Sequence, residues 1–158
     1  MKNTFKRSGA ALISLVLLLV LAVSAGAASS QNVGVKFWKE RSDKESMANS
    51  GIDSDRTATL TRQANGTYTL TLPVMQVSKL GVTGYLSGLT IGDVTYDGTL
   101  TGDFNKATAV LTIKNLPASV LTGSDVNKSV LVTCNIQMDL QVLGEINASA
   151  RMCMWNQK

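Results

Sequence analysis

Histidine is absent from this 158-residue sequence, and cysteine and aromatic residues are scarce. Without histidine the chain cannot carry Ser-His-Asp or Cys-His catalysis, nor the usual zinc sites. The carboxylates are scattered, and no pair sits in an apolar setting of the kind that glycoside hydrolysis needs. Asp43, Asp53 and Asp55 are too irregularly spaced for a calcium loop, and no phosphate-binding glycine motif occurs. We therefore expect no enzymatic activity.

The first 27 residues have the pattern of a secretory signal peptide. The basic segment "MKNTFKR" precedes a 14-residue apolar run from Ala10 to Val23, and small residues follow up to an A-x-A site ending at Ala27. The run is shorter than the roughly 20 apolar residues of a transmembrane helix, and no second span follows. The pattern predicts a secreted, extracellular protein, with an uncleaved N-terminal anchor as the alternative.

Removal of that segment changes the charge of the chain. The full sequence has 15 basic and 11 acidic residues. Lys2, Lys6 and Arg7 lie in the predicted signal peptide, so 12 basic residues remain, a net charge of +1. Nucleic-acid binding needs a clustered positive field, which this composition does not favour. The remaining 131 residues suffice for one domain, which we place at 33–155, after a polar leader at 28–32 and before a tail at 156–158.

Most of the mature sequence has a β pattern. Two threonine-rich alternating runs flank Asn65-Gly66, which is a strong hairpin signal. Short alternating segments with turns every 8–12 residues continue to the C-terminus. This pattern of short strands and regularly spaced turns predicts an antiparallel sandwich or an open barrel of about eight strands. The polar stretch before the first hairpin predicts a loop with one short helical turn near Ser46, Met47 and Ala48.

The last two strands form a predicted long hairpin whose residues divide between two faces. Even-numbered residues from Val130 to Leu140 and from Ile146 to Met154 share one face, whereas Cys153 and Trp155 lie on the other. A three-residue loop ending at a left-handed Gly144 keeps this division and places Cys134 near Met152. A disulfide between Cys134 and Cys153 then needs a bulge, so paired and free cysteines both remain open.

Methionine and small residues are concentrated on one face of this hairpin. Met138, Met152 and Met154 lie there beside Ala148 and Ala150. Small residues leave room for a flat ligand, methionine adapts to planar ligands, and its thioether can bind haem iron. Ordinary core packing is the alternative explanation of the same pattern.

The order of these features resembles the NEAT domain, the haem-capturing module of Gram-positive cell surfaces. The resemblance is carried by "VGVKFWK", then "DKESMANS", then "NGTYTLTLPV", and finally the hairpin "VLVTCNIQMDL…GEINASARMCMW". It covers about 125 residues, nearly all of the mature chain. It implies an immunoglobulin-like antiparallel β-sandwich of about eight strands with one short 3₁₀ helix, and haem bound between that helix and the final hairpin.

The resemblance also implies roles for individual residues. Ser46 matches the family's propionate-binding serine, and Met47 matches the apolar residue after it. The family's iron ligand is the first tyrosine of a Y-x-x-x-Y motif on the last strand. Here Ala148 and Met152 take the two positions, and all three tyrosines precede the hairpin. The chain therefore departs from the family at the iron ligand.

Two functional hypotheses follow from this departure. In the first, the domain binds haem as its cofactor through Ser46, Met47, Ala148, Met152 and Met154, with Met152 or Met154 on the iron and Met47 as a further alternative. In the second, it is an interaction domain without haem that binds a protein partner, such as a host or haem-carrier protein, or another apolar ligand. Phe37 and Trp38 are the candidate contacts of that second hypothesis.

Overall fold

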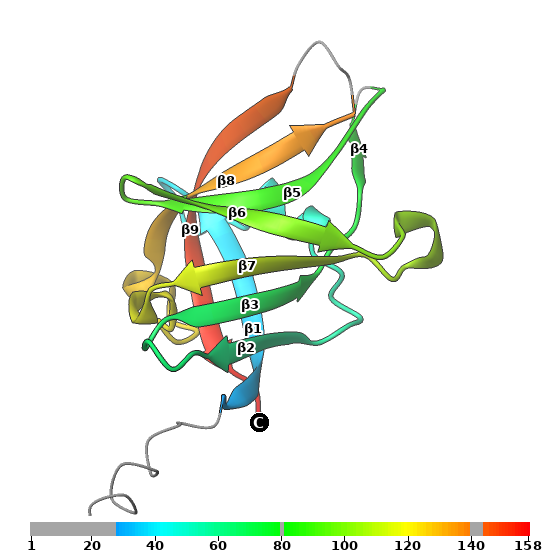
Figure 1. Cartoon of the computed structure of the whole chain (residues 1–158). Coiled ribbons are helices and arrows are strands. Elements are labelled where there is room, and N and C mark those ends of the chain that lie inside the picture. Colours follow the sequence, from blue (N-terminus) through cyan, green and yellow to red (C-terminus); the bar gives the residue numbers. More distant parts are fainter. Residues whose placement is uncertain (1–27, 80, 140–143) are drawn as a thin grey trace, which may run out of the picture.

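The computed structural model describes residues 28–79, 81–139 and 144–158, so the predicted signal peptide lies outside the described residues. The regular structure is almost entirely β, which confirms the predicted class (Figure 1). The strands are β1 (Ser30–Lys39), β2 (Ala58–Arg62), β3 (Tyr68–Pro73), β4 (Val77–Lys79), β5 (Val82–Ile91), β6 (Val94–Thr101), β7 (Val110–Leu116), β8 (Val130–Met138) and β9 (Glu145–Asn156). The 3₁₀ helices are η1 (Met47–Gly51), η2 (Phe104–Lys106), η3 (Ala118–Val120) and η4 (Val126–Lys128).

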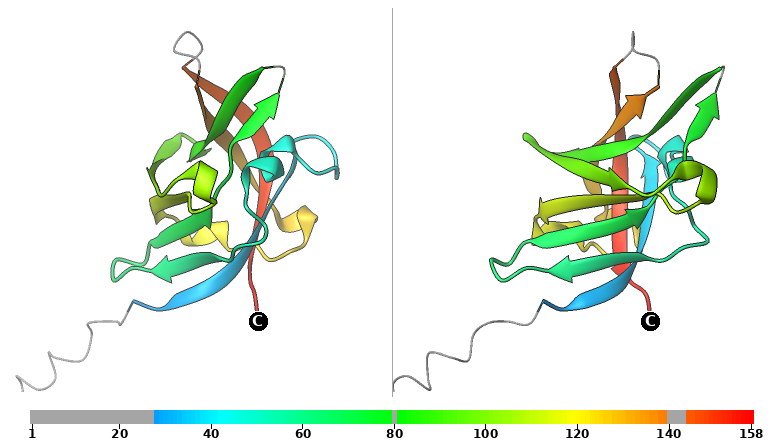
Figure 2. Two further views of the ribbon diagram at one scale, coloured as in Figure 1. Left: turned by 90° about the vertical axis from the view of Figure 1, so that its right-hand side faces the viewer. Right: turned by 45° about the vertical axis from the view of Figure 1, so that its right-hand side comes forward.

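The strands form one antiparallel sheet that closes on itself. Its order is β4-β5-β6-β7-β3-β2-β1-β9-β8, and an additional pairing between β5 and β8 joins the two ends. In Figure 1, β2, β3 and β7 cross in front of the upright strands β1 and β9, and Figure 2 shows the same strands from two further sides. The strands thus close into one sheet, where the sequence predicted a sandwich of two sheets or an open barrel, and the described residues include four short 3₁₀ helices instead of one.

The closure depends on β5, which pairs along both of its edges. One edge binds β4 and β6, and the other binds β8. The register with β8 shifts between Leu86 and Gly88, which marks a bulge at Ser87. A Cβ atom on Gly88 would lie 2.7 Å from the carbonyl oxygen of Tyr96, so only glycine allows β6 to approach this closely. The bulge and the glycine together let a single strand bend around the core.

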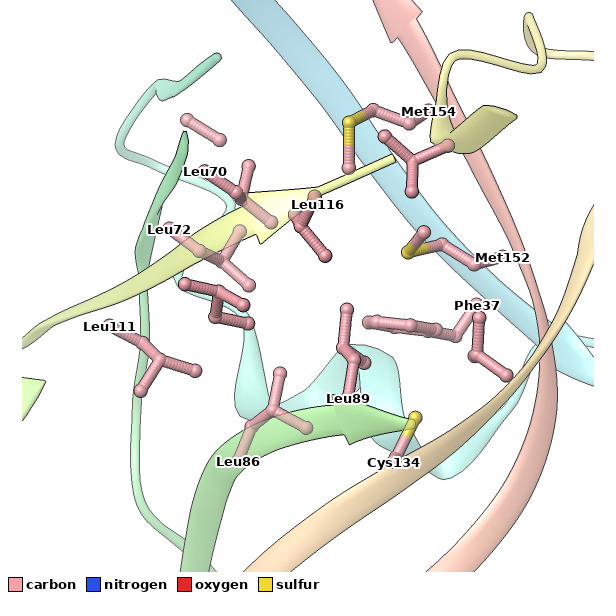
Figure 3. Close-up of a cluster of buried hydrophobic side chains, with 14 of the residues drawn as sticks. Phe37, Leu70, Leu72, Leu86, Leu89, Leu111, Leu116, Cys134, Met152 and Met154 are labelled. Carbon is pink, nitrogen blue, oxygen red and sulfur yellow. The ribbon is translucent and has the colours of Figure 1, made fainter. Parts of the chain in front are cut away.

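The core fills the inside of the closed sheet. Figure 3 shows Phe37 beside Met152, its partner on the neighbouring strand, with Met154 above them, Leu89 and Cys134 below, and leucines of β3 and β7 across from them. Phe37, Met152 and Met154 are completely buried. The alternation in the sequence therefore predicted correctly that these side chains share the inner face, because the inward positions of every strand point to one common interior.

The turn between β2 and β3 confirms the hairpin predicted at Asn65-Gly66. Gly66 has a φ of +83°, which glycine adopts without steric cost. The side-chain oxygen of Asn65 accepts hydrogen bonds from the backbone N–H (3.0 Å) and the hydroxyl (2.7 Å) of Thr67. These local bonds fix the turn and, with it, the register of the two strands.

The hairpin of β8 and β9 has a different register from the predicted one. Cys134 faces Ala148 and Met152 faces Val130, so β9 is displaced by four residues along β8. The reason is a longer connection: the N–H of Met138 bonds the carbonyl of Gly144, and five residues lie between them. Gly144 has the predicted positive φ, 57°, whereas Val142 and Leu143 lie outside the described residues. Because the shift is even, each residue keeps its predicted face.

Both cysteines are free thiols, and both are buried. Cys134 points into the core, whereas the Cys153 thiol lies on the outer face, 3.5 Å from the carbonyl oxygen of Asp125. Burial raises the pKa of the Cys134 thiol to about 12, so it stays protonated and unreactive at neutral pH. The register and the alternation thus keep the two sulfur atoms on opposite sides of the sheet.

We expect the folded protein to react with no thiol reagent at neutral pH, because both sulfur atoms are inaccessible. In denaturant without reductant, two thiols should react. Intact-mass measurement after alkylation, with and without denaturant, checks this. A denatured chain that gains alkyl groups only after reduction would show that the cysteines pair in the protein as produced.

The first and last strands extend slightly beyond the predicted domain bounds of 33–155. β1 begins at Ser30, inside the predicted polar leader, and β9 ends at Asn156. The two ends are tied together, because the N–H of Gln157 donates to the carbonyl of Asn32 at 2.9 Å. Within the described ranges, none of the helices has the length and apolar character that crossing a membrane requires.

Candidate functional site

An apolar pocket lies between η1, the β4–β5 region and the β8–β9 hairpin. It has a volume of about 300 Å³, at the lower end of the range for small-molecule sites. Three parts of the chain line it. They are η1 and its cap (Ser46, Met47, Ala48, Gly51), the β4–β5 region (Val77, Val82, Gly84, Tyr85, Leu86) and the hairpin (Ile136, Met138, Ile146, Ala148).

The position of η1 is fixed by hydrogen bonds to β1. The side chain of Asn49 accepts from the N–H of Phe37 at 2.8 Å and donates to its carbonyl at 2.7 Å. The N–H of Ser46 donates to the same carbonyl at 3.0 Å. At the other end, the carbonyl of Gly51 accepts from the N–H of Met75 at 3.0 Å. A helix of five residues has little stability of its own, so these bonds hold the wall of the pocket in place.

The hairpin wall continues the inner face of the core. Along β9, Ala150 and Met152 are completely buried, whereas Ala148 and Ile146 line the pocket. The change occurs where β1 ends at Lys39, opposite Ala150: beyond that point the described residues of β9 pair with β8 alone. One alternating stripe therefore serves as core at one end and as pocket wall at the other.

The loop that leads from β1 to η1 is held against the outer face of β9. The guanidinium of Arg151 donates to the carbonyls of Lys39 (3.1 Å) and Ser42 (2.9 Å) and pairs with Asp43 at 2.7 Å. On the same outer face the ammonium of Lys36 lies 4.6 Å from the centre of the Trp38 ring. Phe37, in contrast, is a core residue with no exposed surface. Neither aromatic side chain lines the pocket.

Among the described residues that line the pocket, Tyr85 alone has an ionisable side chain. The Tyr85 ring packs against Phe104, with 5.2 Å between the ring centres. The hydroxyl oxygen of Ser46 accepts from the N–H of Ala48 at 3.3 Å and so caps η1. Among the described residues, no group of three or more histidine, cysteine or acidic side chains could hold a metal ion. The pocket thus suits an apolar ligand with few polar groups.

The structure separates the residues predicted for a site. Ser46, Met47 and Ala148 line the pocket together, although Ala148 comes about a hundred residues after the other two in the sequence. Met152 and Met154 have no exposed surface and lie in the core, so neither can touch a ligand in this pocket without a change in packing. Met138, Gly84 and Tyr85 were not predicted as site residues. Only Met138 gave a signal, because it shares the methionine face of the hairpin.

Fold and pocket together define a small all-β domain with an apolar site between a short helix and the final hairpin. The fold is NEAT-like. A point variant of the NEAT5 domain of IsdX2, solved in complex with heme, superimposes with a TM-score of 0.53 and 12% identity, covering 83% of this chain and 98% of that one. The NEAT5 domain of IsdX2, a B. anthracis hemophore solved in complex with heme, gives 0.49 and 11% over the same shares. Neither a protein-family model nor a curated protein sequence matches the chain.

Proposed function

We propose that this chain is a secreted haem-binding or haem-transfer domain, and that haem enters the pocket between η1 and the hairpin. The observation that carries the proposal is an apolar pocket between exactly these two elements in a NEAT-like fold, one of whose structural neighbours binds heme. The apolar run of the first 27 residues supports export. The domain acts by binding, and its partners are haem and a protein that delivers or receives it.

The residues of the pocket fit a porphyrin. Gly84, Ala48 and Ala148 leave the walls free of bulky side chains, and leucine, isoleucine and valine supply apolar contact. Ser46 lies at the start of η1, where its hydroxyl group can donate a hydrogen bond to a propionate. Met47 is 57% exposed beside it and can cover one face of the ring. Met138 brings a thioether, a group that binds haem iron.

A second candidate function is the binding of an apolar segment of a protein partner. Met47 and Ile146 favour it, because both line the pocket and remain exposed, by 57% and 43%. Exposed apolar residues around a concave site are typical of interaction surfaces. Such a domain would use the same pocket without the iron.

Titration with haem in the oxidised and in the dithionite-reduced state tests the proposal. We expect a saturable shift of the Soret band that ends at one equivalent. Ala148→Phe fills the pocket and should weaken binding about tenfold or more, equivalent to about 1.4 kcal/mol. Ser149→Phe is the matched control, because Ser149 is the next residue, is exposed and does not line the pocket. No Soret shift in either state would favour the protein-binding function instead.

A further inference from the structure

Four of the described residues that line the pocket have a side chain with an atom that can bind a metal ion. They are Ser46, Met47, Tyr85 and Met138. The hydroxyl oxygen of Ser46 is occupied as the cap of η1. The Tyr85 ring packs against Phe104, which does not line the pocket. The two thioethers of Met47 and Met138 are therefore the donors that the pocket offers.

Of the two thioethers, that of Met138 is held in place. Met138 is the last residue of β8, and its backbone faces Gly84 on β5 and Gly144, the residue before β9. Its sulfur atom lies over Gly84: a Cβ atom on that glycine would come within 2.8 Å of the sulfur. The missing side chain of Gly84 thus makes the space in which the thioether lies. Met47, by comparison, is 57% exposed on the five-residue η1.

We propose that Met138 supplies the thioether that binds the haem iron in this pocket. The inference rests on the proposed function and replaces Met152 and Met154, which the core encloses. Thioether sulfur is a soft, neutral donor that favours ferrous over ferric iron, and methionine ligation raises the reduction potential of haem. The domain therefore prefers ferrous haem and loses affinity when the iron is oxidised.

The test compares Met138→Leu, Met47→Leu and Tyr85→Phe with the unchanged protein, each loaded with one equivalent of haem. Leucine keeps the volume and the apolar character of methionine, so folding should be preserved. In the unchanged protein we expect the near-infrared charge-transfer band of ferric haem with a methionine ligand. Met138→Leu should abolish this band and lower the ratio of ferrous to ferric affinity about tenfold, which is about 59 mV in reduction potential for one electron. Met47→Leu and Tyr85→Phe should keep the band.

Two sets of results would overturn the inference, and they are distinguishable. If the unchanged protein gives no Soret shift, the proposed function fails and the inference fails with it. If haem binds but the band is absent from the unchanged protein, persists in Met138→Leu, or disappears in Met47→Leu or Tyr85→Phe alone, only the assignment of Met138 fails. The absence of the band from the unchanged protein is measured without any variant, so this outcome remains decisive even if Met138→Leu does not fold.

Discussion

Met152→Ala should lower the free energy of unfolding by about 2–5 kcal/mol, the range for removing most of a large side chain from a core. Met152 has no exposed surface, and it packs in the centre of the closed sheet near Phe37 and Leu89 (Figure 3). The deletion leaves a cavity that a sheet closed through β5 and β8 cannot easily collapse to fill. Denaturant unfolding measures the loss, and an unchanged m-value would show that the two-state transition is preserved.

Met138→Ala is the matched control, because Met138 lies on the same face of the same hairpin but borders the pocket. Its loss should cost about 1 kcal/mol or less, since the side chain is already partly in contact with solvent. Met152→Leu, which keeps the volume, should leave haem affinity unchanged. Equal destabilisation by the two alanine variants, or loss of haem binding in Met152→Leu, would contradict the division of this face into core and pocket.

Asn49→Ala should destabilise the protein by about 2–3 kcal/mol and weaken ligand binding as well. Two hydrogen bonds to the backbone of Phe37 disappear, and the N–H of that residue loses its partner in a half-buried position. Without them η1, which is only five residues long, is no longer fixed against β1. Thermal or denaturant unfolding gives the first effect, and haem titration of the folded fraction gives the second.

Asn105→Ala is the control for this prediction. Asn105 is exposed in η2, and it is its backbone N–H that donates to the Asp103 side chain, so the change should stay within about 0.5 kcal/mol. A variant Asn49→Ala that is as stable as Asn105→Ala would mean that the Asn49 side chain does not hold η1. Loss of stability without loss of affinity would mean that η1 forms no essential wall of the ligand site.

The alternation of residues in the sequence predicted which side chains face inward, and this part of the fold follows from local chemistry. Asn65-Gly66 predicted its turn because glycine alone adopts the positive φ there without cost. The face of Cys134, Met152 and Met154 was predicted because successive side chains of a strand point to opposite sides. The same property explains why the faces were predicted correctly although the register of the final hairpin was not. A shift by an even number of residues leaves every side chain on its face.

Closure of the sheet and the limits of the pocket depend on contacts between distant residues. The pairing of β5 with β8 joins residues about fifty positions apart, and a bulge at Ser87 allows it. No local sequence pattern predicts where the pairing of β1 with β9 ends. Met152, on the paired part of β9, lies in the core, whereas Ala148, beyond the end of β1, lines the pocket. The short helix shows the same division, since the sequence predicted a turn at Ser46 but not the bonds of Asn49 to Phe37.

The sequence by itself thus determined an all-β domain, the two faces of its last hairpin and the absence of histidine chemistry. Each of these depends on residue type and on spacing along one strand. Only the tertiary structure decided that the sheet closes on itself, that the cysteines are buried on opposite sides, and that Met138 lines the pocket while Met152 does not. The physical reason is that an inward direction is a local property of a strand, whereas burial depends on what other parts of the chain bring to cover it.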